Sequence, residues 1–326
     1  MEKSKKTSKL FYLYIFLIVV IAVSIVIMVC FHGNNQSNVV SSEKNEDYHH
    51  ITYNNEKYQY NSSIVSILFL GIDTSDPTDS QGQADVLELL LLDRTNKSMQ
   101  VVSIPRDTMT DIRLYDVEGN SLGWQKHHIN LSYAYANNER NGCMRALQAV
   151  SRMLGDIPIV YYASLNLNML NKVQSIMGSL EVTIPNNSLV DVNPSWKEGT
   201  VLTVDTSNVE TFLRYRNTEI DFSNNERMER QKEYMLAYFK KVNELLKTDF
   251  NQMVESIYSV VKEMTTNISF DDLQVFANMI LEYSFDEKEN FYTLEGENKA
   301  GAFHDEYIID QDKVEAKKVE LFYTKE

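Results

Sequence analysis

Residues 66–72 read SILFLGI, and residues 86–93 read VLELLLLD. The first segment is a short apolar run that ends near Gly71, and the second carries Leu and Val on both faces, so each predicts a buried strand. The polar stretch 94–98 leads from the second run into a third at 99–105. A short turn between two strand-forming runs favours antiparallel neighbours. These runs therefore predict a sheet at the centre of the fold.

The remainder of the chain mixes helical and strand patterns. Between residues 142 and 154, Met144, Leu147 and Leu154 recur at helical spacing. Strands interspersed with helices in this way predict a mixed α/β domain. Further helices are expected at 208–213, 224–246 and 271–283, and further strands at 159–165 and 180–184.

The N-terminus carries an apolar run from Leu10 to Phe31 that no charged residue interrupts. At about 1.5 Å per residue, this run is long enough to cross a hydrocarbon core of about 30 Å. The lysines within residues 1–9 favour a cytoplasmic location for that end. The alternative is a cleaved signal peptide, whose apolar part is about 7–15 residues long and ends at a small-x-small site. Residues 29–32 offer no such site.

We therefore expect a cytoplasmic basic stub at 1–9, a transmembrane helix at 10–31, a polar juxtamembrane linker at 32–60 and an extracytoplasmic domain at 61–326. This organisation makes the chain a single-pass protein of the cell membrane, with its N-terminus in the cytoplasm.

The formal net charge of −15 bears on the choice of partner. An acidic domain is repelled by nucleic-acid phosphates, so we expect no nucleic-acid partner. The chain has two cysteines, Cys30 in the expected membrane helix and Cys143 beyond it, so the domain contains no intradomain disulfide. It must be stabilised by its hydrophobic core, in which Cys143 is expected as a buried structural thiol.

Two carboxylates flank the first strands. Asp73 follows the first strand, and Asp85 precedes the second, so the two side chains are expected at one edge of the sheet. Oxygen ligands of this kind suit a hard cation such as Mg²⁺. The alternative is that both residues form turns and caps next to strands. Arg106 and Asp107 follow a strand that ends at Pro105, and taken alone they are best explained by a surface ion pair.

Arginines gather in a later part of the chain. Arg214 and Arg216 stand at i and i+2, so on an extended segment they share one face. Arg227, Arg230 and Gln231 stand at i, i+3 and i+4 and line one stripe of the expected long helix. Guanidinium groups near a helix N-terminus favour phosphate binding. The alternative is a solvated basic face, which is less attractive in so acidic a chain.

The order of these motifs resembles the LytR-CpsA-Psr family, whose members transfer glycopolymers in the envelope of mainly Gram-positive bacteria. The resemblance rests on Gly71-Ile72-Asp73, Ala84-Asp85, the segment 104–108, Arg214-Tyr215-Arg216 and Arg227-x-x-Arg230-Gln231, and it extends from about residue 66 to the C-terminus. Several motifs in the same order are far more specific than any one of them.

The resemblance implies a fold and an activity. The fold would be an α/β/α sandwich with a central mixed sheet and a long hydrophobic pocket for a lipid tail. The activity would be transfer of a glycopolymer from a polyprenyl-pyrophosphate carrier to peptidoglycan or a related acceptor, with formation of a phosphodiester.

The resemblance also assigns roles to residues. By motif position, Asp73 and Asp85 would hold Mg²⁺, and Asp73, Asp85, Arg106 and Arg216 would form the catalytic centre. The pyrophosphate would be bound by Arg106, Arg214, Arg216, Asp221, Arg227, Arg230 and Gln231.

One position departs from the family pattern. Gln83 stands two residues before Asp85, where the family often carries an arginine, so a positive charge is missing. Two other functions remain open from the sequence. One is a non-catalytic regulator of the cell envelope, and the other is a pyrophosphatase that passes the phosphoryl group to water.

Overall fold

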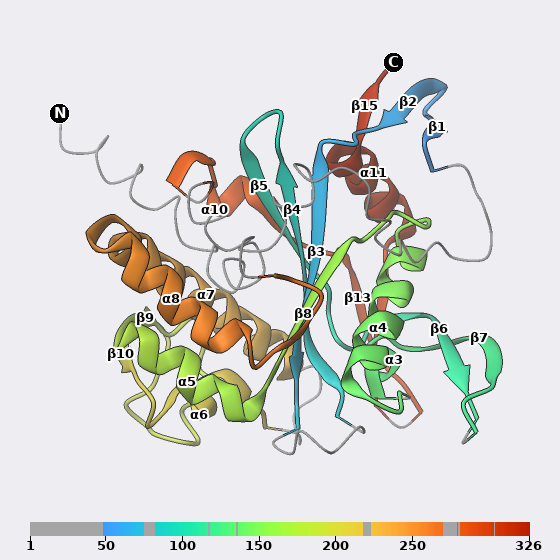
Figure 1. Ribbon diagram of the computed structural model, residues 1–326. Coiled ribbons are helices and arrows are strands. Elements are labelled where there is room, and N and C mark those ends of the chain that lie inside the picture. Colours follow the sequence, from blue (N-terminus) through green and yellow to red (C-terminus); the bar gives the residue numbers. More distant parts are fainter. Residues whose placement is uncertain are drawn as a thin grey trace.

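A six-stranded mixed sheet forms the centre of the computed structural model (Figure 1). The structure describes residues 48–74, 82–116, 118–134, 136–217, 223–269, 279, 281–302 and 304–326. The strand order is β11-β8-β3-β4-β5-β12. β3 pairs antiparallel with β4 and parallel with β8, and β4 pairs antiparallel with β5. The strands are β3 (Ile64–Ile72), β4 (Ala84–Asp93), β5 (Ser98–Ser103), β8 (Tyr161–Asn166), β11 (Thr265–Thr266) and β12 (Phe291–Thr293).

Helices cover both faces of this sheet (Figure 1). Side chains alternate along β3, so that Ile67 and Phe69 enter the core on one face while Leu68 and Leu70 enter the core on the other. The first core is closed by α5 (Leu167–Met177), α6 (Val209–Arg214), α7 (Ser223–Thr248) and α8 (Phe250–Val261). The second is closed by α3 (Leu131–Ala134), α4 (Glu139–Met153) and α11 (Gln311–Phe322).

Smaller elements surround this body. Three short ribbons pair antiparallel: β6 (Met109–Tyr115) with β7 (Ser121–His128), β9 (Leu180–Thr183) with β10 (Val201–Val204), and β13 (Gly296–Ala300) with β14 (Asp305–Ile309). The short helix α10 (Glu287–Asn290) precedes β12. Cys143 in α4 is fully buried, and burial raises the pKa of its thiol to about 12, as expected of a structural cysteine.

The predicted central strands and helices at 142–154, 208–213 and 224–246 are confirmed within a few residues. The predicted linker at 32–60 is wrong at its C-terminal end, because β1 (His50–Tyr53) and β2 (Glu56–Tyr60) form a hairpin there. β15 (Tyr323–Lys325) pairs with β2, so this hairpin is tied to the other end of the chain. Backbone pairing and edge-to-face tyrosine contacts, such as Tyr60 against Tyr323 at 5.9 Å between ring centroids, order a segment whose polar composition suggested no regular structure.

Two expectations concern residues that the structure does not describe. The expected transmembrane helix at 10–31 lies outside the described residues, as does most of the helix expected at 271–283. Among the described residues, no helix combines the length and the apolar character that crossing a membrane requires.

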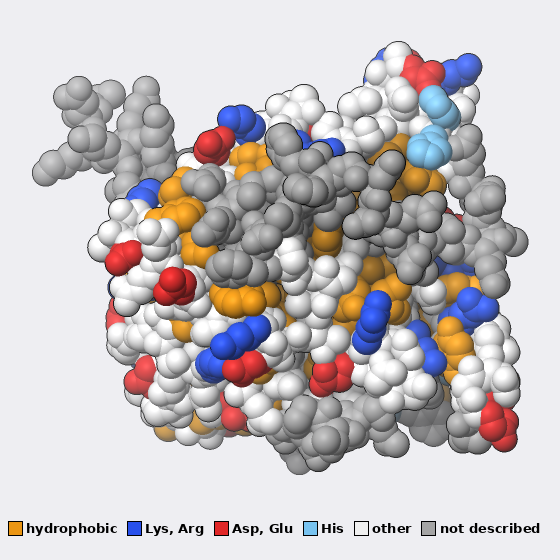
Figure 2. Space-filling view, in the orientation of Figure 1, with side chains coloured by type: hydrophobic (Ala, Val, Ile, Leu, Met, Phe, Trp, Pro, Cys, Tyr) orange, Lys and Arg blue, Asp and Glu red, His pale blue; other side chains and the backbone are white. Residues whose placement is uncertain are grey.

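The molecular surface in Figure 2 mixes acidic and basic side chains. On the face in view, basic residues form no continuous band across the molecule.

Candidate active site

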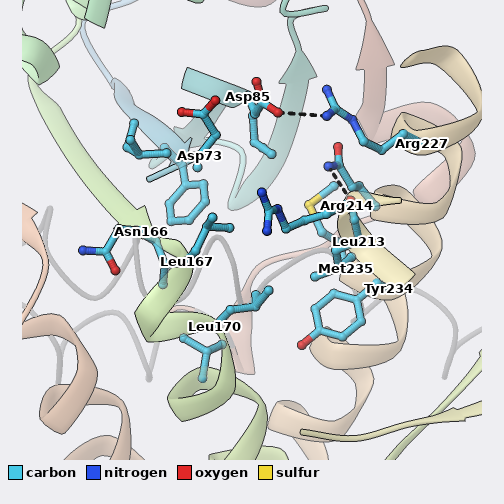
Figure 3. Close-up of a pocket in the computed structure, with 17 residues that line it drawn as sticks. Asp73, Asp85, Asn166, Leu167, Leu170, Leu213, Arg214, Arg227, Tyr234 and Met235 are labelled. Atoms are coloured by element: carbon cyan, nitrogen blue, oxygen red, sulfur yellow. Dashed lines mark hydrogen bonds and ion pairs between the residues drawn. The ribbon is translucent and has the colours of Figure 1, made fainter. Parts of the chain in front are cut away.

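An apolar pocket opens beside the predicted carboxylates and arginines (Figure 3). It lies over β3, β4 and β8 and is roofed by α5 and α7. Leu165, Leu170 and Val173 are among its apolar walls. Its polar lining consists of Asp73, Asp85, Asn166, Arg214, Arg227 and Gln231. One cavity therefore combines a hydrocarbon-like interior with a charged rim.

A β-bulge directs Asp85 toward this pocket. Ile72 pairs with Ala84 and Gly71 with Val86, so Asp85 is an extra residue in β4. The bulge places both Asp85 and Val86 on the pocket side, while Ala84 enters the opposite core. Gly71 permits this arrangement, because a Cβ added there would meet the Cβ of Val86 at 2.9 Å.

Asp85 bridges two arginines. Its Oδ2 accepts a hydrogen bond of 2.8 Å from Nη1 of Arg227, and its Oδ1 accepts one from Nη1 of Arg106. The Arg227 side chain is only 6% exposed. Burial lowers its pKa, as do the charges of Arg106 and Arg216, whereas Asp85 opposes this shift. The buried arginine therefore depends on Asp85 for its counter-charge.

Asp73 is the second carboxylate of the site. Its Oδ1 accepts a hydrogen bond of 2.6 Å from the backbone N–H of Gln83. Burial raises the pKa of Asp73, and the nearby charge of Asp85 raises it further. The sequence-based expectation that the two carboxylates meet at one edge of the sheet is confirmed (Figure 3).

Gln83 has a role that sequence reasoning missed. Its Oε1 accepts hydrogen bonds from Nη2 of Arg106 at 3.2 Å and from Nδ2 of Asn130 at 2.8 Å. A residue with only donors, such as the arginine frequent in the family, offers no such acceptor. Gln83 therefore orients Arg106 and, through its backbone, Asp73. No sequence signal singled out Asn130 as a member of this network.

Arg230 occupies a different place from the one expected. We expected it to contact the pyrophosphate, but its side chain lies away from the pocket lining and is fully buried. It donates to the backbone oxygens of Phe212 and Tyr215 and to the hydroxyl of Ser188. Gln231 does line the pocket, and its Nε2 donates to the oxygen of Leu213 at 3.1 Å. Both side chains thus hold the segment that leads to Arg216.

Arg214 and Arg216 do not share an extended segment as predicted. Arg214 is the last residue of α6, is exposed, and forms an ion pair with Glu210 one turn earlier. Arg216 follows the helix, is partly buried, and lies close enough to Arg227 to lower the pKa of that residue. Asp221 lies outside the described residues.

The carboxylate pair meets one requirement of a magnesium site. Among the described residues, no group of three or more His, Cys, Asp or Glu side chains could hold a metal ion. Mg²⁺ in phosphoryl-transfer sites is commonly held by one or two carboxylates, with substrate phosphates and water as the other ligands. Burial and the charge of Asp85 raise the pKa of Asp73, and a cation between the two carboxylates would offset that charge. The residues present therefore fit this ion.

Three comparisons relate the chain to known proteins. The model of the LytR_cpsA_psr family matches residues 27–322. The polyisoprenyl-teichoic acid–peptidoglycan teichoic acid transferase TagU of Bacillus cereus is 30% identical over 69% of this chain and 68% of its own length. The TagU protein of Enterococcus faecalis is 28% identical over 67% of this chain and 66% of its own. The crystal structure of B. subtilis TagV covers 80% of this chain and 97% of its own, with a TM-score of 0.59 and 22% identity.

The fold and the site define an apolar cavity whose rim carries arginines and carboxylates, an arrangement complementary to an amphiphile with an anionic head. The family match extends over most of the chain, and the chain belongs to the LytR_cpsA_psr family.

Proposed function

We propose that this protein transfers a glycopolymer of the teichoic-acid class from a polyprenyl-pyrophosphate carrier to a hydroxyl group of peptidoglycan. Membership of the family supports the reaction type, and the names of the TagU relatives support the polymer and the acceptor. The product is a phosphodiester between polymer and peptidoglycan.

One observation carries the proposal: the apolar pocket ends directly at the Asp85–Arg227 ion pair. A lipid pyrophosphate has the same division, with a hydrocarbon tail joined to a strongly anionic head. The match between pocket and substrate therefore extends over both parts of the molecule.

The reaction exchanges one phosphorus–oxygen bond for another. The acceptor hydroxyl oxygen attacks the phosphorus that carries the glycan, and the bond from this phosphorus to the bridging oxygen of the pyrophosphate breaks. Polyprenyl phosphate leaves with the electron pair. The hydroxyl proton passes to Asp73, because both oxygens of Asp85 accept hydrogen bonds from arginines, whereas no arginine of the described part of the chain donates to Asp73.

The arginines stabilise charge during this exchange. Arg227 is nearly buried, so its field at the phosphate is weakly screened by water. Arg106 is fixed by Asp85, Asp107 and Gln83, which removes the need to order it when substrate binds. Arg216 supplies a further positive charge beside Arg227. Asp73 and Asp85 would hold Mg²⁺, which would neutralise pyrophosphate oxygens when bound.

The location of the protein belongs to the same proposal. A membrane helix at 10–31 keeps the domain at the bilayer that contains the polyprenyl carrier, which raises the effective concentration of the substrate. The domain then lies on the outer side, where peptidoglycan is found.

The test is reconstitution with the full-length protein in detergent, a short polyprenyl-pyrophosphate glycan, Mg²⁺ and a peptidoglycan oligomer. A phosphodiester-linked product is expected. Free phosphorylated glycan as the only product would assign hydrolysis instead, and no reaction at all would favour a regulatory protein.

A further inference from the structure

A second pocket lies on another flank of α7. It is formed between the end of β5, the N-terminal half of α7, β12 and the β13–β14 ribbon. Pro105, Asn225, Lys232, Phe291 and Asn298 are among its lining residues. Its volume is about 440 Å³, within the range of about 300–1,000 Å³ that is usual for small-ligand sites.

The walls of this pocket belong to the segments that carry the arginines. Pro105 directly precedes Arg106, and Asn225 precedes Arg227 by two residues. On the far wall, the backbone N–H of Tyr307 donates to the oxygen of Asp107 at 2.8 Å. A ligand in this pocket therefore contacts the two segments that carry Arg106 and Arg227.

The lining differs from that of the lipid pocket. It is half polar, and the side-chain amides of Asn225 and Asn298 have no hydrogen-bond partner among the described residues. Beside them lies the Phe291 ring, with Nζ of Lys232 4.8 Å from its centre. A flat apolar ring next to free amides matches a pyranose, which has an apolar face and polar edges. N-acetyl groups add amides that pair with asparagine side chains.

The two pockets lie against different stripes of α7 and different strands of the sheet. The apolar pocket is lined by the face of α7 that carries Arg227, Gln231 and Tyr234, and it lies over β8, β3 and β4. The second pocket uses the α7 stripe with Asn225 and Lys232 and lies over β5 and β12. In phosphoryl transfer, the attacking and leaving oxygens lie on opposite sides of the phosphorus. An acceptor in the second pocket would therefore reach the phosphorus from another side of α7 than the lipid.

We propose that this second pocket is the acceptor subsite and binds an N-acetylhexosamine unit of the peptidoglycan glycan. The proposal rests on the transferase function proposed above and assigns its second substrate a place. The sugar's hydroxyl then reaches the phosphorus beside Arg106 and Arg227, while its ring lies against Phe291.

The test uses the full-length protein in detergent with a peptidoglycan tetrasaccharide as acceptor. Lys232→Ala and Asn298→Ala change two independent elements, and Lys240→Ala, further along α7 and away from this pocket, is the matched control. Each subsite variant is expected to raise the KM for the tetrasaccharide about five- to tenfold, because each removes a polar contact. The KM for the lipid-linked donor and the melting temperature are expected to stay at wild-type values, as in the control.

The outcomes separate the two proposals. An unchanged acceptor KM in both variants, with wild-type transfer intact, overturns the subsite alone. A rise in the donor KM instead of the acceptor KM also overturns it and assigns the pocket to sugars of the polymer. If the wild-type protein forms no phosphodiester at all, the transferase function fails and the subsite fails with it. Direct calorimetric titration with the tetrasaccharide supplies a readout independent of turnover, and equal affinity in wild type and both variants again overturns the subsite.

Discussion

Because of Glu88, the free energy of unfolding of the protein is expected to fall as the pH rises. This side chain lies on β4 and is 6% exposed. Its Oε1 accepts a hydrogen bond of 2.9 Å from Ser103, while Oε2 is buried without a partner in the described part of the chain. Burial raises the pKa of Glu88 from 4.5 to about 8, and the Ser103 hydroxyl offsets only part of this shift. At neutral pH the folded protein therefore keeps this carboxyl protonated.

The sign of the effect follows from proton linkage. Between pH 4.5 and 8 the unfolded chain loses the Glu88 proton while the folded chain retains it, so stability falls with rising pH. Each pKa unit corresponds to about 1.4 kcal/mol, so the loss at pH 7 amounts to about 3 kcal/mol. Below pH 4.5 both states are protonated and the loss vanishes.

The perturbation that tests this is Glu88→Gln, which keeps the shape and removes the titration. Urea unfolding of wild type, Glu88→Gln and the exposed control Glu255→Gln is measured at pH 5, 6, 7 and 8 in the same detergent. The stability of Glu88→Gln relative to wild type is expected to rise by about 3 kcal/mol from pH 5 to pH 8. The control is expected to follow wild type. Parallel profiles for Glu88→Gln and wild type would refute the buried, protonated state.

Three further predictions concern the site and its frame. Asp85→Asn leaves the buried Arg227 without its counter-charge, so urea unfolding is expected to show a loss of about 3–5 kcal/mol together with loss of transfer; wild-type stability would contradict the ion pair. Gln83→Leu removes the acceptor shared by Arg106 and Asn130, so kcat is expected to fall at least about tenfold in the transfer assay, with Gln83→Glu closer to wild type; equal loss in both would speak against an acceptor role. Gly71→Ala places a Cβ 2.9 Å from the Cβ of Val86. Thermal unfolding is expected to show a loss of about 1–3 kcal/mol in the free energy of unfolding. An unchanged melting temperature would mean that the bulge rearranges to accept the added methyl group.

The sequence predicts the frame of the site well because the frame depends on local pattern. Apolar runs at β3, β4 and β5 are long enough to be read as strands, and their ends fix where Asp73 and Asp85 emerge. Because side chains alternate along β3, Phe69, Gly71 and Asp73 lie on one face of the sheet. What the pattern does not reveal is the bulge that turns Asp85 onto that same face, because a bulge is a property of the paired register.

The side-chain network around the arginines is less predictable for a similar reason. Helical spacing places Arg227 and Arg230 on one stripe, yet Arg227 reaches Asp85 while Arg230 is held by backbone oxygens near the end of α6. Those partners are distant in sequence and are brought together only by packing. Gln83 was noticed for the charge it lacks, whereas its role lies in the acceptor it provides. The β1–β2 hairpin was missed because its partner strand is the C-terminal one.

The most direct test of the proposed function is the fate of the oxygen atoms during turnover. The full-length protein is incubated in H₂¹⁸O with Mg²⁺, the lipid-linked glycan and a peptidoglycan oligomer, and the products are analysed by mass spectrometry, with Arg216→Ala as the variant expected to be inactive. Transfer to the acceptor hydroxyl predicts a phosphodiester without ¹⁸O, because the new bond takes its oxygen from that hydroxyl. Phosphorylated glycan that carries ¹⁸O, with no phosphodiester, would contradict it.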